Sequence, residues 1–324
     1  MESWDLRSQF QEAVKAKGGW VNCHGHFDKS YFISKKSLAQ SMVTMETKWR
    51  MSDDIKKNST QAEVEERIRR VLDSLIEQGG QAAMSFIDAY DVVGHKNIDA
   101  ANKVKEEYKD KIKFYTAPQP LGGLNDKKAR DLYEEITAKM DFAGGLPSFD
   151  RPDDDNNYDY LFSIAKNLGK HIHIHIDQEN NPHERDTEKL IKYTKKYGYE
   201  GKVTAIHVLS VSAQPKEYRQ KIYRQMADLG MNVIVCPTNV INMTQLDQYT
   251  APIHNSIANV PEMLDAGLLI ALGTDDIADF YNPFCDADMW IELRALADAC
   301  RYFDFDKLVD IATVNGRKIL ELVE

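Results

Sequence analysis

The chain has 324 residues, with 41 Lys+Arg against 51 Asp+Glu and a formal net charge of −10. This negative balance argues against nucleic acid and anionic membranes as its partners. A hydrophobic content of 43% and a charged content of 28% exclude the disordered and fibrous classes. The first residues are polar and no apolar run approaches about 18 residues, so we expect a cytoplasmic protein.

Short apolar runs alternate with amphipathic segments along nearly the whole chain, which is typical of βα repetition. The expected strands are residues 20–23, 82–87, 112–117, 142–146, 171–176, 203–207, 232–236 and 268–273. The expected helices are 61–78, 97–108, 126–139, 157–168, 187–197, 216–229, 256–266 and 286–300, with an N-terminal helix at 2–16 and a helical tail at 306–323. Eight such units predict an α/β fold, a (β/α)₈ TIM barrel, as a single domain over 1–324. A doubly wound open sheet is the alternative, but no GxGxxG or P-loop pattern follows any expected strand.

One expected connection, residues 30–59, is far longer than a usual βα loop. It carries Trp49 and the methionines Met42, Met45 and Met51. In a barrel this loop lies on the catalytic face, so we interpret it as a substrate lid. The alternative is an ordinary surface excursion with a small helix of its own.

The nine histidines are unevenly placed along the chain. Random placement predicts about a quarter of one His-x-His pair, whereas the chain has three, one at 24–26 and two within 171–175. Several of these histidines, together with one aspartate, come at or just after the ends of expected strands, which converge at the mouth of a barrel. Imidazoles and a carboxylate bind a zinc-like ion and leave a position for water. The predicted metal ligands are His24, His26, His175 and Asp275, and His207 is predicted to orient or polarise the attacking water.

This ordered set resembles the amidohydrolase superfamily, which has HxH after strand one, His after strands five and six, and Asp after strand eight. The stretch His24-Gly-His-Phe-Asp-Lys-Ser-Tyr31 is similar to the HxHxDKS segment of its cytosine deaminase-like branch, which includes N-isopropylammelide isopropylaminohydrolase. Ala117-Pro-Gln119 is similar to the glutamine with which this branch binds a substrate amide. The resemblance continues through residues 201–207 and 274–283 and covers about 21–320.

The resemblance implies a barrel with one divalent metal, Zn²⁺ first and Fe²⁺ second. It also implies release of ammonia or an alkylamine from a small nitrogen heterocycle, such as a pyrimidine or triazine, by attack of metal-bound hydroxide. A single ion is further supported by residues 141–147, which lack the bridging lysine of two-metal relatives. Gln119 would pair with a lactam edge, and Lys29 would hold a carbonyl oxygen or donate a proton. Asp276 would contact the ring or the leaving amine, Tyr281 would shape the pocket, and homo-oligomers are an expected state.

Two departures from the family pattern keep alternatives open. Deaminases of the superfamily carry HxxE after strand five, whereas this chain has Gln178 at the position of the proton-shuttling Glu. A glutamine does no acid/base work near pH 7, so Asp177, Glu179, Lys29 or His207 would have to move the proton. Hydrolysis of a cyclic amide on the same site and a catalytically silent ligand-binding barrel are the alternative functions. The sequence also shows no segments for the β-sandwich that flanks the barrel in most relatives, so we expect a barrel without it.

Overall fold

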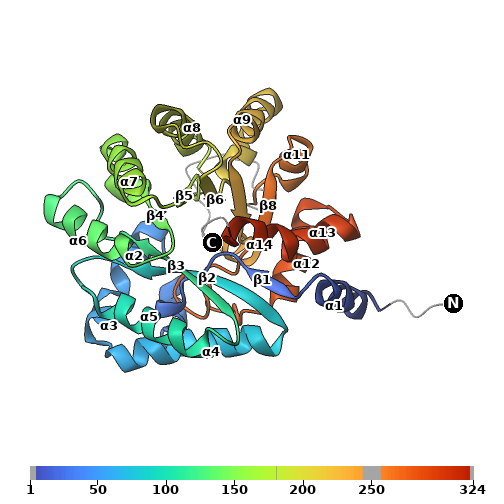
Figure 1. Ribbon diagram of the computed structural model, residues 1–324. Coiled ribbons are helices and arrows are strands. Elements are labelled where there is room, and N and C mark those ends of the chain that lie inside the picture. Colours follow the sequence, from blue (N-terminus) through green and yellow to red (C-terminus); the bar gives the residue numbers. More distant parts are fainter. Residues whose placement is uncertain (1–4, 180, 244–256, 322–324) are drawn as a thin grey trace.

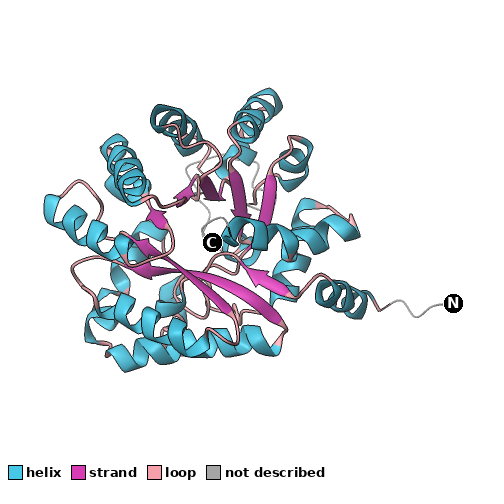
Figure 2. Cartoon of the chain, in the orientation of Figure 1, coloured by secondary structure: helices cyan, strands magenta, loops and turns pink. Residues whose placement is uncertain are grey.

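The computed structural model describes residues 5–179, 181–243 and 257–321, and its strands form a parallel barrel surrounded by helices (Figures 1 and 2). Hydrogen bonding orders the strands as β1-β2-β3 and as β4-β5-β6-β7-β8. These strands are β1 (Trp20–Asn22), β2 (Gly80–Asp88), β3 (Lys113–Gln119), β4 (Ala143–Gly145), β5 (Ile172–Ile176), β6 (Val203–His207), β7 (Asn232–Val235) and β8 (Leu269–Leu272). The predicted (β/α)₈ class is confirmed.

Backbone hydrogen bonds join the two groups of strands into a closed barrel. Between β8 and β1, the N–H of Cys23 donates to the carbonyl of Leu272 at 2.9 Å. Next to β3 and β4, the N–H of Phe142 donates to the carbonyl of Thr116 at 3.1 Å. Closure brings the carboxyl ends of all the strands to one face, where barrel enzymes carry their sites.

The helices between the strands cover the outside of the barrel, and α12, α13 and α14 follow β8 (Figure 1). No helix in the described part of the chain has the length and apolar character needed to cross a membrane. The helices are α1 (Leu6–Ala16), α2 (Met45–Met51), α3 (Asp53–Asn58), α4 (Gln61–Glu77), α5 (Lys96–Tyr108), α6 (Lys127–Ala138), α7 (Asp154–Leu168), α8 (Asp186–Tyr197), α9 (Lys216–Asp228), α10 (Pro237–Ile241), α11 (Val260–Asp265), α12 (Met289–Cys300), α13 (Phe305–Ala312) and α14 (Val314–Leu320).

Two apolar layers hold the fold, one inside the barrel and one between the barrel and the helices. On β5 the side chains alternate, so that three isoleucines face the outer layer. The intervening His173 and His175 face inward, where their rings contact Phe142 and Phe86 at centroid distances of 4.2 and 4.5 Å. The inner layer includes Val21, Cys23, Met84, Phe86, Tyr115, Phe142, Ile206, Ile234 and Ala271.

The α4 helix shows how local sequence signals define an element. The Thr60 hydroxyl accepts a hydrogen bond from the Glu63 N–H at 3.3 Å, and the Glu63 carboxylate accepts one from the Thr60 N–H at 2.7 Å. This capping box satisfies two backbone donors that the first helical turn leaves free. The apolar residues spaced along α4 are buried against the barrel, as their helical spacing predicts: Val64, Ile68, Val71, Leu72 and Leu75.

Several predicted helix boundaries are wrong. The α7 helix begins three residues earlier than expected, at Asp154. The α11 helix begins at Val260, four residues after the expected start at 256, which lies outside the described part. The α1 helix begins at Leu6, because the Asp5 carboxylate caps it by accepting the Ser8 N–H, and residues 1–4 lie outside the described part. The helical tail at 306–323 is two helices that separate at Thr313. The α12 helix begins three residues later than expected, because the Asp288 carboxylate accepts the N–H of Trp290 as an N-terminal cap.

The long connection after β1 is folded into short helices and is not an open loop. It contains two 3₁₀ turns, Phe27–Lys29 and Leu38–Ser41, followed by α2 and α3. The ammonium of Lys56 on α3 lies 2.8 Å from the Asp88 carboxylate at the end of β2, and both groups are buried. This ion pair fixes α3 to the carboxyl end of the barrel.

Candidate metal centre and active-site pocket

The predicted ligand residues meet at the carboxyl end of the barrel. His24 and His26 follow β1, His175 lies near the end of β5, His207 ends β6, and Asp275 follows β8. All five side chains are buried. The structure therefore brings together residues that are up to 251 positions apart in the chain.

The carboxylate of Asp275 lies at the centre of this group. Its Oδ1 is 3.1 Å from the Nε2 of His24 and 3.2 Å from the Nε2 of His26. Its Oδ2 is 3.5 Å from the Nε2 of His207. The Nε2 of His175 lies 3.2 Å from the Nε2 of His24.

Unusual backbone conformations orient two of these side chains. His207 and Asp275 have φ values of +76° and +60°, a left-handed region that costs a residue with a Cβ about 1–2 kcal/mol. Gly273 lets β8 approach β1, since a Cβ there would lie 2.8 Å from the Cβ of His24. Backbone strain at His207 and Asp275 and the close approach of β8 to β1 therefore occur together where the five side chains meet.

The site favours neutral imidazoles beside an ionised carboxylate. Burial lowers the pKa of His26 to about 3 and that of His207 to about 4. Burial alone would raise the pKa of Asp275, but attraction to His24 and hydrogen bonds from His24 and His26 hold it well below 3.8. The Nδ1–H of His175 donates to the carbonyl of Gly145 at 3.2 Å, which turns its Nε2 lone pair toward the other donors.

These donors fit a divalent metal ion. In a tetrahedral zinc site, ligand atoms about 2.0–2.1 Å from the metal are about 3.3 Å from one another. Three separations match that spacing: His24 to Asp275 at 3.1 Å, His26 to Asp275 at 3.2 Å and His24 to His175 at 3.2 Å. The donor atom of His26 clusters with those of Asp275 and Asp276. The ligand atoms of His24, His175, His207 and Asp275 also lie within 4.8 Å of one another, so His207 is near enough to assist or join the set.

A second polar cluster adjoins the candidate metal centre. The ammonium of Lys29 is paired with the carboxylate of Asp276 and lies 3.3 Å from that of Asp279. It also lies 4.1 Å from the centroid of the Tyr281 ring. Burial opposes the charge, but the two carboxylates outweigh it and raise the pKa of Lys29 well above 10.5, so it remains an ammonium.

The two clusters line one pocket, which contains nearly every predicted site residue. Gln119 lines it from the end of β3, and its Oε1 is buried without a hydrogen-bond partner among the described residues. The amide N–H of Gln178 donates to the Ser148 hydroxyl at 3.1 Å. The lining residues are His26, Lys29, Trp49, Gln119, Leu121, Leu146, His175, Gln178, His207, Asn239, Met243, Asp275, Asp276 and Tyr281.

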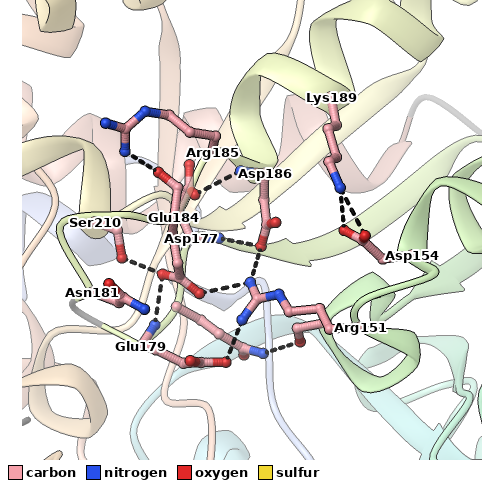
Figure 3. Close-up of polar contacts among 12 residues, drawn as sticks. Arg151, Asp154, Asp177, Glu179, Asn181, Glu184, Arg185, Asp186, Lys189 and Ser210 are labelled. Carbon is pink, nitrogen blue, oxygen red and sulfur yellow. Dashed lines mark hydrogen bonds and ion pairs between the residues drawn. The ribbon is translucent and has the colours of Figure 1, made fainter.

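Two carboxylates proposed from the sequence as proton carriers, Asp177 and Glu179, do not line this pocket. Asp177 accepts hydrogen bonds from the backbone N–H groups of Asp186 and Thr187, and so caps α8. Burial and the carboxylate of Asp186 raise the pKa of Asp177 to about 8. Glu179 pairs with Arg151 at 2.8 Å, in the cluster of acidic side chains shown in Figure 3.

Four lining residues were not predicted from the sequence: Leu121, Leu146, Asn239 and Met243. Trp49, in the connection expected to form a lid, reaches the pocket from α2. Next to it, the buried ammonium of Lys48 lies 5.7 Å from the centroid of the Tyr281 ring. Asn239 on α10 donates its side-chain N–H to the Oδ2 of Asp275. The only available signal for Asn239 was its place shortly after a strand end, which many residues share.

Comparisons with known proteins agree with this geometry. Residues 18–323 match the model of the Amidohydrolase family. An uncharacterised protein of Haemophilus influenzae is 32% identical over 80% of this chain and 95% of its own length. The N-isopropylammelide isopropyl amidohydrolase of Pseudomonas sp. is 24% identical over 88% of this chain and 70% of its own length. The structure of 5-methylcytosine deaminase from Klebsiella pneumoniae, liganded with 5-fluorocytosine, superposes with a TM-score of 0.86 at 22% identity, covering 94% of this chain and 74% of that chain.

The chain therefore belongs to the amidohydrolase family, and the resemblance noted from its sequence motifs is confirmed. Membership of this family confirms the predicted class, a hydrolase of carbon–nitrogen bonds.

Proposed function

We propose that the protein is a mononuclear metal-dependent aminohydrolase that releases ammonia or an alkylamine from a small nitrogen heterocycle. The observation that carries the proposal is the meeting of neutral imidazoles and the Asp275 carboxylate at a pocket lined by Gln119 and Lys29. The names of two relatives, a 5-methylcytosine deaminase and an N-isopropylammelide isopropyl amidohydrolase, support pyrimidines and triazines as substrate classes. The substrate is a small molecule, and we propose a cytoplasmic location and assembly into homo-oligomers.

We assign His24, His26, His175 and Asp275 as the ligands of one divalent ion, with Zn²⁺ preferred and Fe²⁺ as the alternative. Imidazole and carboxylate donors suit both ions. When bound, such an ion activates water at neutral pH and polarises the carbon–nitrogen bond. The contacts of the His24 and His26 Nε2 atoms with one carboxylate oxygen of Asp275, at 3.1 and 3.2 Å, are the geometry behind this assignment.

The remaining side chains bind and orient the substrate. His207, with its Nε2 3.5 Å from Asp275 Oδ2, is placed to accept or return a proton at Nε2 and to stabilise negative charge as it develops. The ammonium of Lys29 is held by Asp276 and faces the pocket, where it stabilises a carbonyl oxygen of the ring. Gln119 offers a free buried carbonyl to a ring N–H, and Tyr281 closes the wall beside Lys29.

Gln178 limits which residues of the pocket can transfer a proton to the leaving group. It lines the pocket but neither takes up nor releases a proton near pH 7. The leaving amine therefore receives its proton through His207, because the raised pKa of Lys29 keeps it an ammonium. We propose that Gln178 only holds the substrate. An alkylamine, which is more basic than the amide-like nitrogen of a ring, is the leaving group best suited to such a site.

Purified protein reconstituted with Zn²⁺ or Fe²⁺ tests the proposal against pyrimidines, purines and triazines that carry amino or alkylamino groups. Release of ammonia or alkylamine, with the ring intact by mass spectrometry, is the expected result. Ring opening without amine release would show a cyclic amide hydrolase instead. Binding without any product would show a silent ligand-binding barrel and would overturn the proposal.

A further inference from the structure

Asn239 has a fixed orientation in the pocket. Its side chain is 8% exposed, and its Nδ2–H donates to the Oδ2 of Asp275. A carboxylate oxygen only accepts hydrogen bonds, so the amide nitrogen of Asn239 must face Asp275 and the amide oxygen must face away from it. That oxygen, Oδ1, is buried and has no hydrogen-bond partner among the described residues, and Asn239 lines the pocket.

The backbone that carries Asn239 is held in place by a buried carboxyl group. The carboxyl group of Glu292 on α12 accepts a hydrogen bond from the backbone N–H of Thr238 at 3.1 Å and forms a second one with the Thr238 hydroxyl. The side-chain amide of Asn282 donates to the same hydroxyl at 3.0 Å. The first turn of α10 is therefore fixed on both sides, and the Asn239 amide oxygen is a preorganised acceptor.

Gln119 presents a second acceptor of the same kind. Its Oε1 is also buried and unpartnered among the described residues, and the side chain is 6% exposed. Gln119 ends β3 and Asn239 follows β7, and these strands lie across the barrel from each other in the closed strand order. Two buried carbonyl acceptors without donors cost free energy unless a ligand supplies N–H groups to both.

The two acceptors have different neighbours. Asn239 and His207 both approach the Oδ2 of Asp275, so the Asn239 amide lies on the reacting side of the pocket. Gln119 lies on the opposite wall of the pocket, where it would face the far edge of the ring of a bound substrate. A substrate that satisfies both sites has a ring N–H at one edge and an amine N–H at the carbon that reacts.

We infer that Asn239 recognises the N–H of the leaving amine and positions Asp275 through the same amide group, an inference that rests on the proposed function. The substrate class is then a heterocycle with a primary or secondary exocyclic amine. A tertiary amine has no hydrogen to donate, so it leaves Oδ1 buried and unpaired. Sites built around such a hydrogen bond reject the analogue that lacks it far more strongly than they reject a change of size.

Two probe series test this inference: cytosine, N4-methylcytosine and N4,N4-dimethylcytosine, and ammelide, N-isopropylammelide and N,N-dimethylammelide. In the zinc-loaded wild-type protein we expect kcat/KM for the N–H compounds to exceed that for the dimethyl compound by about 10- to 100-fold. In Asn239→Leu and in the smaller Asn239→Ser this ratio should fall to near one. Asn232→Leu is the matched control, because Asn232 is equally buried, at 8% exposed, but begins β7 at the other end of the barrel.

A second readout does not depend on turnover. Asn239→Leu should weaken Zn²⁺ binding by about 10-fold in a chelator competition, because the supporting hydrogen bond to Asp275 is lost, whereas Asn232→Leu should not. If no probe is turned over, the proposed function fails. The inference is then tested by calorimetry, as the ratio of the dissociation constant of the dimethyl compound to those of the N–H compounds. A ratio that survives in both Asn239 variants, or Zn²⁺ binding that is unchanged, would overturn the inference.

Discussion

The Nε2 atoms of His24 and His175 lie 3.2 Å apart although the two residues are 151 positions apart in the chain. His175 donates its Nδ1–H to the carbonyl of Gly145, so its Nε2 carries a lone pair that faces His24. A neutral His24 has at most one Nε2–H, whereas both this lone pair and the Oδ1 of Asp275, at 3.1 Å, lie against that nitrogen. A bound cation would serve all three donor atoms at once, and the metal assignment rests on this geometry.

Substitution of two histidines separates metal binding from activity. We expect His26→Ala to weaken Zn²⁺ binding by about 100-fold or more, because a direct ligand contributes more than its supporting hydrogen bonds. His207→Ala should retain Zn²⁺ and lose most amine release. Chelator competition and amine assays on both variants check this, and a fully active, metal-free His26→Ala protein would refute the assignment.

Gln178→Glu tests the role of the missing proton carrier. Position 178 lines the pocket and lies within hydrogen-bond reach of the Ser148 hydroxyl, so a carboxylate there introduces an acid/base group. Acid/base catalysis contributes about 10²–10⁴-fold, so ammonia release from cytosine-like substrates should appear or rise. Gln178→Met, of similar volume, is the control and should show no gain. An unchanged rate in Gln178→Glu would contradict the interpretation that the absent shuttle limits deamination.

The buried carboxyl of Glu292 predicts a pH-dependent difference in stability. Burial raises its pKa from 4.5 to about 8, so the folded protein holds a proton there that the unfolded chain releases above pH 4.5. Its contribution to stability is therefore lost as the pH rises from 4.5 to 8, by about 1.4 kcal/mol per unit. Glu292→Gln does not titrate, so its stability relative to wild type should increase by about 2–3 kcal/mol between pH 5.5 and 7.5. Urea unfolding at both values checks this, and a difference that stays constant with pH would exclude it.

Arg151 should stabilise the loop that carries Gln178. Its guanidinium lies 2.8 Å from each of Glu179, Glu184 and Asp186 (Figure 3). Arg151→Met leaves these carboxylates without their shared cation, and we expect a loss of about 2–3 kcal/mol in the free energy of unfolding.

The matched control for this change is Arg294→Met. Within the described part of the chain, Arg294 pairs only with Asp298, at 3.8 Å, and both side chains are exposed, so its loss should cost less than about 0.5 kcal/mol. Equal destabilisation of both variants in urea unfolding would show that the acidic cluster does not depend on Arg151.

The residues that meet at the metal centre were predictable because a barrel obeys a simple spatial rule. The carboxyl ends of parallel strands converge, so His175 and Asp275 meet whatever the intervening sequence. The same rule places Gln119 at the pocket. These predictions needed only the strand ends, which the apolar runs marked to within a few residues.

The remaining features depend on side-chain direction, which periodicity does not reveal. Asp177 follows the β5 strand as the pattern required, but its backbone has a φ of +47° and its carboxylate turns to cap α8. Asn239 looks like an ordinary residue after a strand, and only its contact with Asp275 distinguishes it. The α7 helix, expected from residue 157, begins at Asp154, which is buried and pairs with Lys189 at 2.7 Å.

Metal content coupled to amine release tests the central claim most directly. The purified protein is stripped with a chelator, reconstituted with Zn²⁺ or Fe²⁺, and examined by elemental analysis and by amine assay on the responsive heterocycle. The account predicts one equivalent of metal per chain, no amine release from the stripped protein and recovery on reconstitution. Amine release by the metal-free protein, or failure to retain metal after reconstitution, would contradict it.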